Sequence, residues 1–191
     1  MGEKETRLVE AAIEVFSRYG VRRTTMGDIA AQAGISRQTL YATYSGKDQI
    51  LNAALCHISR LTLDKIRTDW AERQTIADKL DVYFNHAVIA FFEQIRSMPD
   101  SRDLMGGASD GIAINYAEAE EPKKQALADQ FLPYAKRLSG AGMSSRDLAD
   151  FILQSTQSFK IVAIDEAHLR RLLKTLKGSV LALIGEHQCD V

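Results

Sequence analysis

The chain is short of the residues that cross-link or interrupt a fold. Only two cysteines, Cys56 and Cys189, occur among its 191 residues, and they form no CxxC pair. A disulfide framework is thereby excluded, and the sequence suits a reducing compartment, so we expect a cytoplasmic protein. Only three prolines occur in the chain, which leaves room for long helices.

Long hydrophobic runs are missing as well. The longest apolar runs, such as AVIAFF, are far shorter than the roughly 20 residues that a membrane span needs. The N-terminal stretch MGEKETRLVE is charged and lacks the apolar segment of a signal peptide. With 46% hydrophobic and 26% charged residues, we expect a globular protein without a membrane partner.

Motifs of catalysis and metal binding are also lacking. The four histidines, His57, His86, His168 and His187, show no HExxH spacing, and no GxGxxG or Walker motif is present. Cys56 and His57 are neighbours in a helical pattern, so their side chains point about 100° apart and cannot form a nucleophile and base pair. We therefore expect no enzymatic activity, no metal site and no cofactor.

Helical periodicity is what the chain does contain. Apolar residues recur three and four positions apart through most of the sequence, and no convincing alternating strand occurs. Three short helices are predicted within residues 4–45, and longer ones follow. We predict an all-α protein with a small N-terminal domain at residues 1–48 and a larger helical domain at residues 49–191.

Charge by itself gives little guidance to function. The net charge is −1, and residues 1–60 carry eight Lys and Arg against six Asp and Glu. This excess supports nucleic-acid binding only weakly. The positions of particular residues must carry the argument.

The small domain contains the signals of a helix-turn-helix. Thr25, with Asp28 three residues later, can cap the helix MGDIAAQA. That helix is predicted to end at Gly34, and Ser36 can cap a second helix, RQTLYATY. Two short helices joined by a turn that contains Gly predict a helix-turn-helix.

Polar residues of this motif suit contact with DNA. A helix in the major groove needs groups that bind the backbone at its flanks and groups that read bases at its N-terminal positions. We expect phosphate contacts from four hydroxyls and one ammonium: Thr25, Ser36, Tyr41, Thr43 and Lys47. The expected base contacts are Arg37, Gln38 and Thr39. In the alternative, Thr25 and Ser36 only cap helices, Tyr41 packs, and Lys47 is a solvated charge.

The spacing of these residues resembles that of the TetR family of one-component transcriptional regulators. The resemblance rests on Thr25, Ile29-Ala30, Ala33-Gly34-Ile35-Ser36, Thr39-Leu40-Tyr41, Tyr44 and Lys47. The upstream LVEAAIEVFSRYGVRRTT is similar to the first helix and loop of that family. Gln38 departs from it, because the family often has a small residue there, and so does the pair Ala42-Thr43, where His or Tyr is frequent.

The resemblance implies a dimeric regulator. We expect a repressor that a small-molecule effector releases from a palindromic operator. Its last two helices, within residues 144–163 and 165–184, are implied to pack against their copies in a four-helix bundle. The expected interface consists of Ile152, Ser155, Phe159, Leu169, Leu173, Leu176 and Val180. In the alternative, these apolar stripes face the core of their own subunit.

The segment VYFNHAVIAFFEQI, residues 82–95, is apolar around most of its circumference and is predicted to be a central, buried helix. Within it, Asn85 or His86 could supply the polar contacts of an apolar effector pocket. The candidate pocket residues are Tyr83, Phe84, Asn85, His86, Phe92, Met105, Tyr116, Phe151 and Phe159. In the alternative, His86 is a satisfied core residue and the aromatic side chains are plain core.

A second function remains open from the sequence. The protein could be a dimeric helical module that binds a ligand or a protein and has little sequence-specific affinity for DNA. Binding to upstream DNA in a gel-shift assay, tested for its dependence on salt, separates the two functions.

Overall fold

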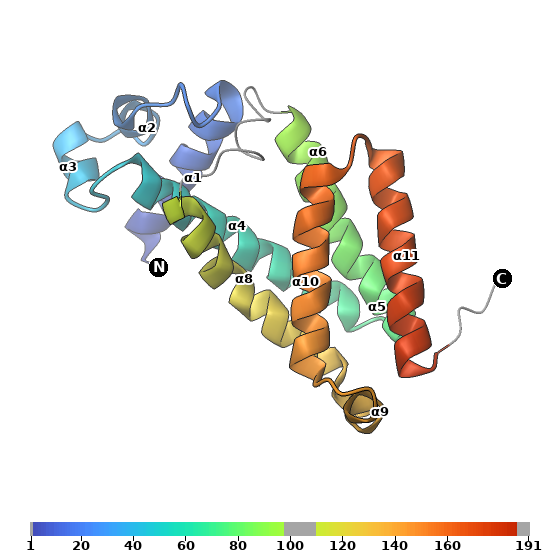
Figure 1. Ribbon diagram of the computed structural model, residues 1–191. Coiled ribbons are helices and arrows are strands. Elements are labelled where there is room, and N and C mark those ends of the chain that lie inside the picture. The colour runs from blue at the N-terminus through green and yellow to red at the C-terminus, as the bar shows by residue number, and fades with distance from the viewer. Residues whose placement is uncertain (1, 98–109, 187–191) are drawn as a thin grey trace. The chain divides into compact units, whose positions relative to one another are not determined.

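The computed structural model describes residues 2–97 and 110–186, with the backbone alone at residues 110–118. In this part of the chain every regular element is helical (Figure 1), so the all-α class is confirmed. The N-terminal elements are α1 (Glu3–Tyr19), α2 (Met26–Gln32), α3 (Arg37–Tyr41) and α4 (Lys47–Trp70). They are followed by α5 (Ile76–Tyr83), the π-helix η1 (Phe84–Ile89), α6 (Ala90–Ser97) and α8 (Asp110–Gln130). The last elements are the 3₁₀ turn η2 (Leu132–Tyr134), α9 (Ala135–Gly140), α10 (Ser145–Val162) and α11 (Glu166–Ile184).

The helices form two compact units, each of which takes two stretches of the chain. The first contains residues 1–60 and 94–120, and the second contains residues 61–93 and 121–191. The division between the units therefore falls within α4, after Arg60. The domain boundary that the sequence placed after residue 48 stays a prediction.

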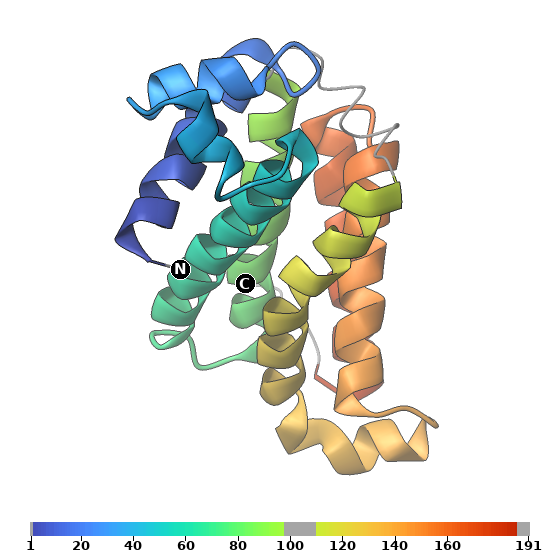
Figure 2. The same ribbon diagram turned by 90° about the vertical axis from the view of Figure 1, so that its left-hand side faces the viewer.

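In the first unit, α1, α2 and α3 pack around one apolar core (Figure 2). Helices as short as α2 and α3 are not stable alone in water, so the core they share with α1 and α4 stabilises them. The buried residues of this core are Leu8, Val9, Ala12, Val15, Phe16, Met26, Ile29, Ala30, Leu40, Tyr44, Ile50, Leu51 and Ala54.

The turn between α2 and α3 has the expected geometry. Gly34 has a φ of 66°, a left-handed conformation that favours glycine. The amide of Ile35 then donates to the carbonyl of Ala30 at 3.0 Å, which closes the helix end. Helix α3 is shorter than predicted, because it ends at Tyr41 and Tyr44 turns into the core.

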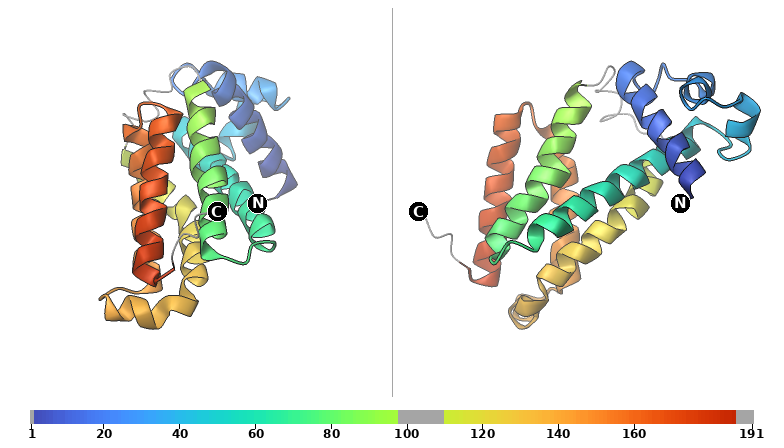
Figure 3. Two further views of the ribbon diagram at one scale, coloured as in Figure 1. Left: turned by 90° about the vertical axis from the view of Figure 1, so that its right-hand side faces the viewer. Right: turned by 180° about the vertical axis from the view of Figure 1, so that it is seen from behind.

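In the second unit, α11 packs against α5, η1, α9 and α10 (Figure 3). The segment expected as one central helix is three consecutive elements, with the π-helix η1 between α5 and α6. Its burial is as predicted for its apolar residues, which include Tyr83, Phe84, Val88 and Phe92. The π-helix widens the turn, so the amide of Ala90 reaches the carbonyl of Asn85, five residues before it.

Candidate nucleic-acid interface

Thr25 is engaged in a complete capping box at the start of α2. Its hydroxyl accepts from the amide of Asp28 at 3.2 Å and donates to the Asp28 carboxylate at 2.7 Å. Its own amide donates to the same carboxylate at 2.8 Å. The cap predicted from the sequence is therefore formed. Thr25 remains exposed, but a phosphate would have to compete with Asp28 for the hydroxyl proton.

Ser36 caps α3 in a similar way. Its hydroxyl accepts from the amide of Thr39 at 3.1 Å and lies 2.9 Å from the Thr39 hydroxyl. When Thr39 donates in that pair, the proton of Ser36 is available to a phosphate. Thr43 is half-buried, and its hydroxyl lies 3.5 Å from the carbonyl of Thr39. The Ser36 hydroxyl thus stabilises the start of α3, whereas the Thr43 hydroxyl lies just after its end.

Tyr41 and Gln38 are exposed polar residues of α3. Tyr41 is 51% exposed, and its hydroxyl makes no hydrogen bond to any described residue. Gln38 is also exposed. The alternative in which Tyr41 packs does not hold, and both side chains point away from the core that Leu40 enters.

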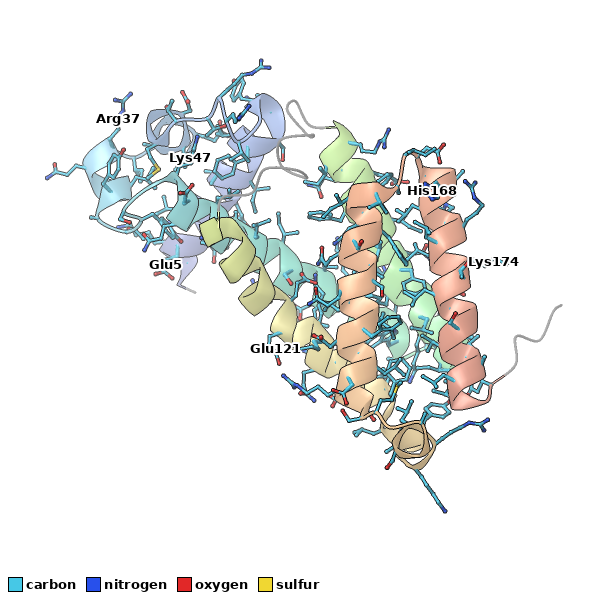
Figure 4. All side chains as sticks on the ribbon, in the orientation of Figure 1. Glu5, Arg37, Lys47, Glu121, His168 and Lys174 are labelled. Atoms are coloured by element: carbon cyan, nitrogen blue, oxygen red, sulfur yellow. The ribbon has the colours of Figure 1, made fainter. Side chains whose placement is uncertain are left out.

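Arg37 is held at the first turn of α2. A Cβ at Gly27 would lie 2.4 Å from Nη2 of Arg37, so the missing side chain of Gly27 makes room for the guanidinium. Hydrogen bonds from the Thr25 side chain and backbone lower the pKa of Asp28 below 3.8, and the charge of Arg37 adds to this effect. Figure 4 shows Arg37 on α3.

Lys47 is directed into the protein. From the first turn of α4, its ammonium donates to the carbonyls of Val21 at 2.9 Å, Thr24 at 3.2 Å and Arg22 at 3.3 Å. It is half-buried, so the alternative of a solvated charge does not hold. The sequence reasoning missed this partner loop because it lies more than 20 residues away along the chain. No local spacing signals such a contact.

The expected pocket residues are only partly brought together. Tyr83, Phe84 and Phe92 are buried in the core of the second unit, whereas Phe151 is exposed on α10. Phe151 is therefore not a pocket wall in this structure, and Phe159 is only half-buried. Met105 and the side chain of Tyr116 lie outside the described residues.

The two polar candidates of that segment have different surroundings. His86 is half-buried, and its Nε2 lies 2.7 Å from Oδ2 of Asp69 in α4, so its polar group is satisfied. Asn85 is exposed at a shallow cleft between α5, η1 and α11. The residues that line this cleft are Asp81, Phe84, Asn85, Ile89, Arg170, Leu173, Lys174 and Lys177.

The expected dimer residues require a correction. Ile152, Leu169, Leu173, Leu176 and Val180 are buried within their own subunit. They face α5, η1 and the neighbouring helices, because an amphipathic helix buries its most apolar stripe first. They are therefore not available to a partner, as the sequence alternative allowed. Ser155 and Phe159 are half-buried.

A different set of apolar residues is exposed near α10. Phe151 is 58% exposed, and Ile161, Val162 and Ile164 are exposed by 59%, 55% and 72%. We call these four residues the α10 patch. The sequence did not reveal this patch, because periodicity alone does not separate the apolar residues of α10 that face the core from those that face outward. Among the described residues, no helix is long and apolar enough to cross a bilayer, and no group of three metal-binding side chains gathers.

Comparison with known sequences supports the N-terminal module. A family model described as bacterial regulatory proteins, tetR family, matches residues 8–54. The transcriptional regulator SrpR of Pseudomonas putida is 40% identical over 53 residues, which are 28% of this chain and 25% of SrpR. The uncharacterized regulator YezE of Bacillus subtilis is 28% identical over 144 residues, 73% of this chain and 66% of YezE. The chain thus spans only about a quarter of the length of SrpR.

Comparison with solved structures supports the fold over nearly the whole chain. The fatty acid degradation regulator FadR of Bacillus halodurans superposes with a TM-score of 0.67, at 17% identity, over 98% of both chains. FadR of Bacillus subtilis, solved in complex with stearoyl-CoA, gives a TM-score of 0.62 at 19% identity, over 95% of this chain and 99% of that chain. Residues 8–54 thus form the N-terminal module of the TetR family of bacterial regulatory proteins, and the fold shared with solved structures extends over nearly the whole chain.

Proposed function

We propose that the protein is a transcriptional repressor that binds a palindromic operator as a homodimer and leaves it when a small molecule binds. The observation that carries the proposal is the capped α2-turn-α3 module. Its core side chains are buried, while Gln38 in the first turn of α3 and Tyr41 at its end face outward. In such modules the N-terminal residues of the second helix read base edges.

The roles within the module follow from side-chain chemistry. Gln38 can bind adenine through two hydrogen bonds, and Arg37 can bind guanine if it leaves the first turn of α2. Tyr41 and Ser36 can donate to phosphate oxygens. These groups bind DNA of any sequence and fix the position of the helix in the groove.

Selection of bound DNA from a random pool tests this function. We expect an enriched palindrome with half-sites about one helical turn apart. Affinity for it should fall steeply with salt, because phosphate contacts release counterions. A pool without an enriched sequence would instead favour the dimeric module with little specific affinity for DNA.

The proposed dimer uses the α10 patch. Three exposed apolar side chains lie at residues 161–164, and Phe151 lies about 15 Å before them along α10. Exposed apolar side chains suit coverage by a partner, and a two-fold axis would bring each α10 onto its copy. Ser155 and Phe159 follow Phe151 by four and eight residues on the same helix and stay in the proposed interface. We expect α3 of each subunit, called the recognition helix below, to bind one half-site of the operator.

The proposed effector site is the cleft between α5, η1 and α11. Buried Phe84, Ile89 and Leu173 give it an apolar floor. Its rim is mainly cationic. Nε of Arg170 forms an ion pair with Oε1 of Glu166 at 2.6 Å, and Nζ of Lys177 forms one with Oδ2 of Asp81 at 2.5 Å.

Lys174 has no ion-pair partner among the described residues, and Figure 4 shows it on α11. The floor and rim together suit an effector with an apolar body and an anionic group. Stearoyl-CoA, found with FadR of Bacillus subtilis, is of this chemical class.

Effector binding would reach the DNA module through α4. This helix is continuous, with residues 47–60 in the first unit and residues 61–70 in the second. Its Asp69 holds His86 of the π-helix that borders the cleft. A coupling of about 1–3 kcal/mol is typical, and operator DNA must weaken effector binding by the same factor.

Fatty acids and their CoA esters, screened by thermal shift, test the effector site. A compound that stabilises wild type should lose affinity for Lys174→Ala and keep it for Lys136→Ala, an exposed lysine on α9. Equal affinity for wild type and Lys174→Ala would place that compound elsewhere. A compound that binds equally well with and without operator is not the effector.

A further inference from the structure

We propose that Lys47 is a positioning residue that fixes the loop between α1 and α2 for DNA binding, and does not itself contact phosphate. The loop comprises residues 20–25 and is called the α1–α2 loop below. The proposal rests on the proposed function, and it assigns to Lys47 a role other than the one its charge suggests.

The hydrogen bonds of Lys47 carry the proposal. Its ammonium has three protons, and three loop carbonyls lie within 3.3 Å of Nζ. Bonds from a charged donor are stronger than neutral ones, so the three together favour this arrangement. A phosphate could take a proton only by displacing one of these carbonyls.

The loop that Lys47 holds leads directly to the DNA-binding helix start. Helix α1 is followed by Gly20, which has a φ of 81°. The buried hydroxyl of Thr24 donates to the carbonyl of Gly20 at 2.7 Å. Thr25 follows and caps α2. Because the loop carbonyls turn toward α4, the side chains of Arg22 and Arg23 are left exposed on the surface.

The position of Lys47 also makes the loop sensitive to α4. Lys47 is the first residue of that helix, so a displacement of its first turn carries the ammonium and the three carbonyls with it. The orientation of the α1–α2 loop is thereby tied to α4. A shift of α4 would change the phosphate contacts of Thr25 as well as the spacing of the recognition helices.

Two substitutions at Lys47 separate positioning from direct contact. Lys47→Met removes both the charge and the donors. Lys47→Arg keeps a charge that binds phosphate well, but its planar fork cannot direct donors at three converging carbonyls. Lys65→Met is the matched control, because it removes a charge from the exposed face of the same helix.

Each variant is measured in two ways. The first is affinity for the selected operator as a function of salt. The second is hydrogen exchange of the Thr24 amide in the free protein, where this amide donates to the carbonyl of Gly20 at 3.3 Å. The Leu40 amide in α3 serves as the reference for global unfolding. If Lys47→Met does not fold, Lys47→Arg alone decides the question.

We expect both Lys47 variants to weaken operator binding by about tenfold or more, equivalent to about 1.4 kcal/mol. Both should also speed exchange at Thr24 relative to Leu40, and Lys65→Met should do neither. The proposal is overturned if Lys47→Arg binds like wild type and Thr24 exchange is unchanged. In that case Lys47→Met alone should lower the salt slope, by about 0.9 for each lost phosphate contact. If the wild type selects no DNA, the proposed function fails, whereas faster exchange at Thr24 would still show that Lys47 anchors the loop.

Discussion

The α10 patch offers the sharpest test of the proposed dimer. Phe151 is 58% exposed, and a phenylalanine covers about 150–250 Å² when fully buried, so about 100 Å² is left for a partner. At about 25 cal/mol per Å², that area is worth about 2.5 kcal/mol. A two-fold interface contains two copies of Phe151, so Phe151→Glu should weaken the free energy of dimerisation by about 5 kcal/mol.

This cost predicts a large change in assembly. Five kcal/mol corresponds to a dissociation constant raised by about 10³–10⁴, and the two new carboxylates would also repel each other. We expect Phe151→Glu to sediment as a folded monomer at concentrations where the wild type is a dimer. It should also lose operator binding, because a single half-site gives too little affinity.

The matched control is Leu132→Glu. Leu132 is 60% exposed in η2 and lies outside the α10 patch, so this variant should remain dimeric. Far-ultraviolet circular dichroism of both variants reports whether they are folded. A Phe151→Glu protein that dimerises with the affinity of wild type would refute the interface, and so would a monomeric wild type at operator-binding concentrations.

Three further predictions concern single residues. Gln38→Ala should change the sequence selected from a random pool, with a loss of about 1–3 kcal/mol on the original operator and an unchanged affinity for random DNA; an equal loss on both would remove Gln38 from base reading. Asp28→Asn should lower stability at pH 7. Because the pKa of Asp28 is lowered in the folded state, the stabilisation by its carboxylate is present above pH 3.8 and is lost as the pH falls through the folded pKa. The difference in stability between Asp28→Asn and wild type should therefore vanish in acid. Urea unfolding from pH 7 to pH 2 measures this difference, and a difference that persists at pH 2 would contradict the prediction. Ile152→Ala should lower the free energy of unfolding by about 2–5 kcal/mol, as in a packed core, without weakening the dimer; a variant of normal stability that dissociates would return Ile152 to the interface.

Much of the first unit was predictable because its signals are local. A cap at Thr25, another at Ser36 and a glycine in the turn between them each act over three or four residues. Their chemistry can therefore be read in the sequence, and the structure forms all three. The core positions followed from helical periodicity for the same reason.

The sequence could not assign the apolar residues of α10 and α11 to the core or to an interface, because that depends on which neighbour covers each face of a helix. Helix α11 carries one apolar stripe, and periodicity cannot say whether α5 and η1 or a second subunit covers it. The structure places Leu173 and Val180 against the subunit's own core. The exposed residues of α10 were hidden from the sequence because Phe151 and Ile152 are equally apolar.

The sequence by itself determined the helices, their caps and the helix-turn-helix, since these depend on bonds between residues a few positions apart. Only the tertiary structure decided the surroundings of Lys47, His86 and Phe151. Lys47 meets a loop that begins 27 residues earlier, and His86 meets Asp69 across a turn between two helices. The helical repeat of 3.6 residues per turn determines which residues share a face. The packing of the other helices determines which face is covered.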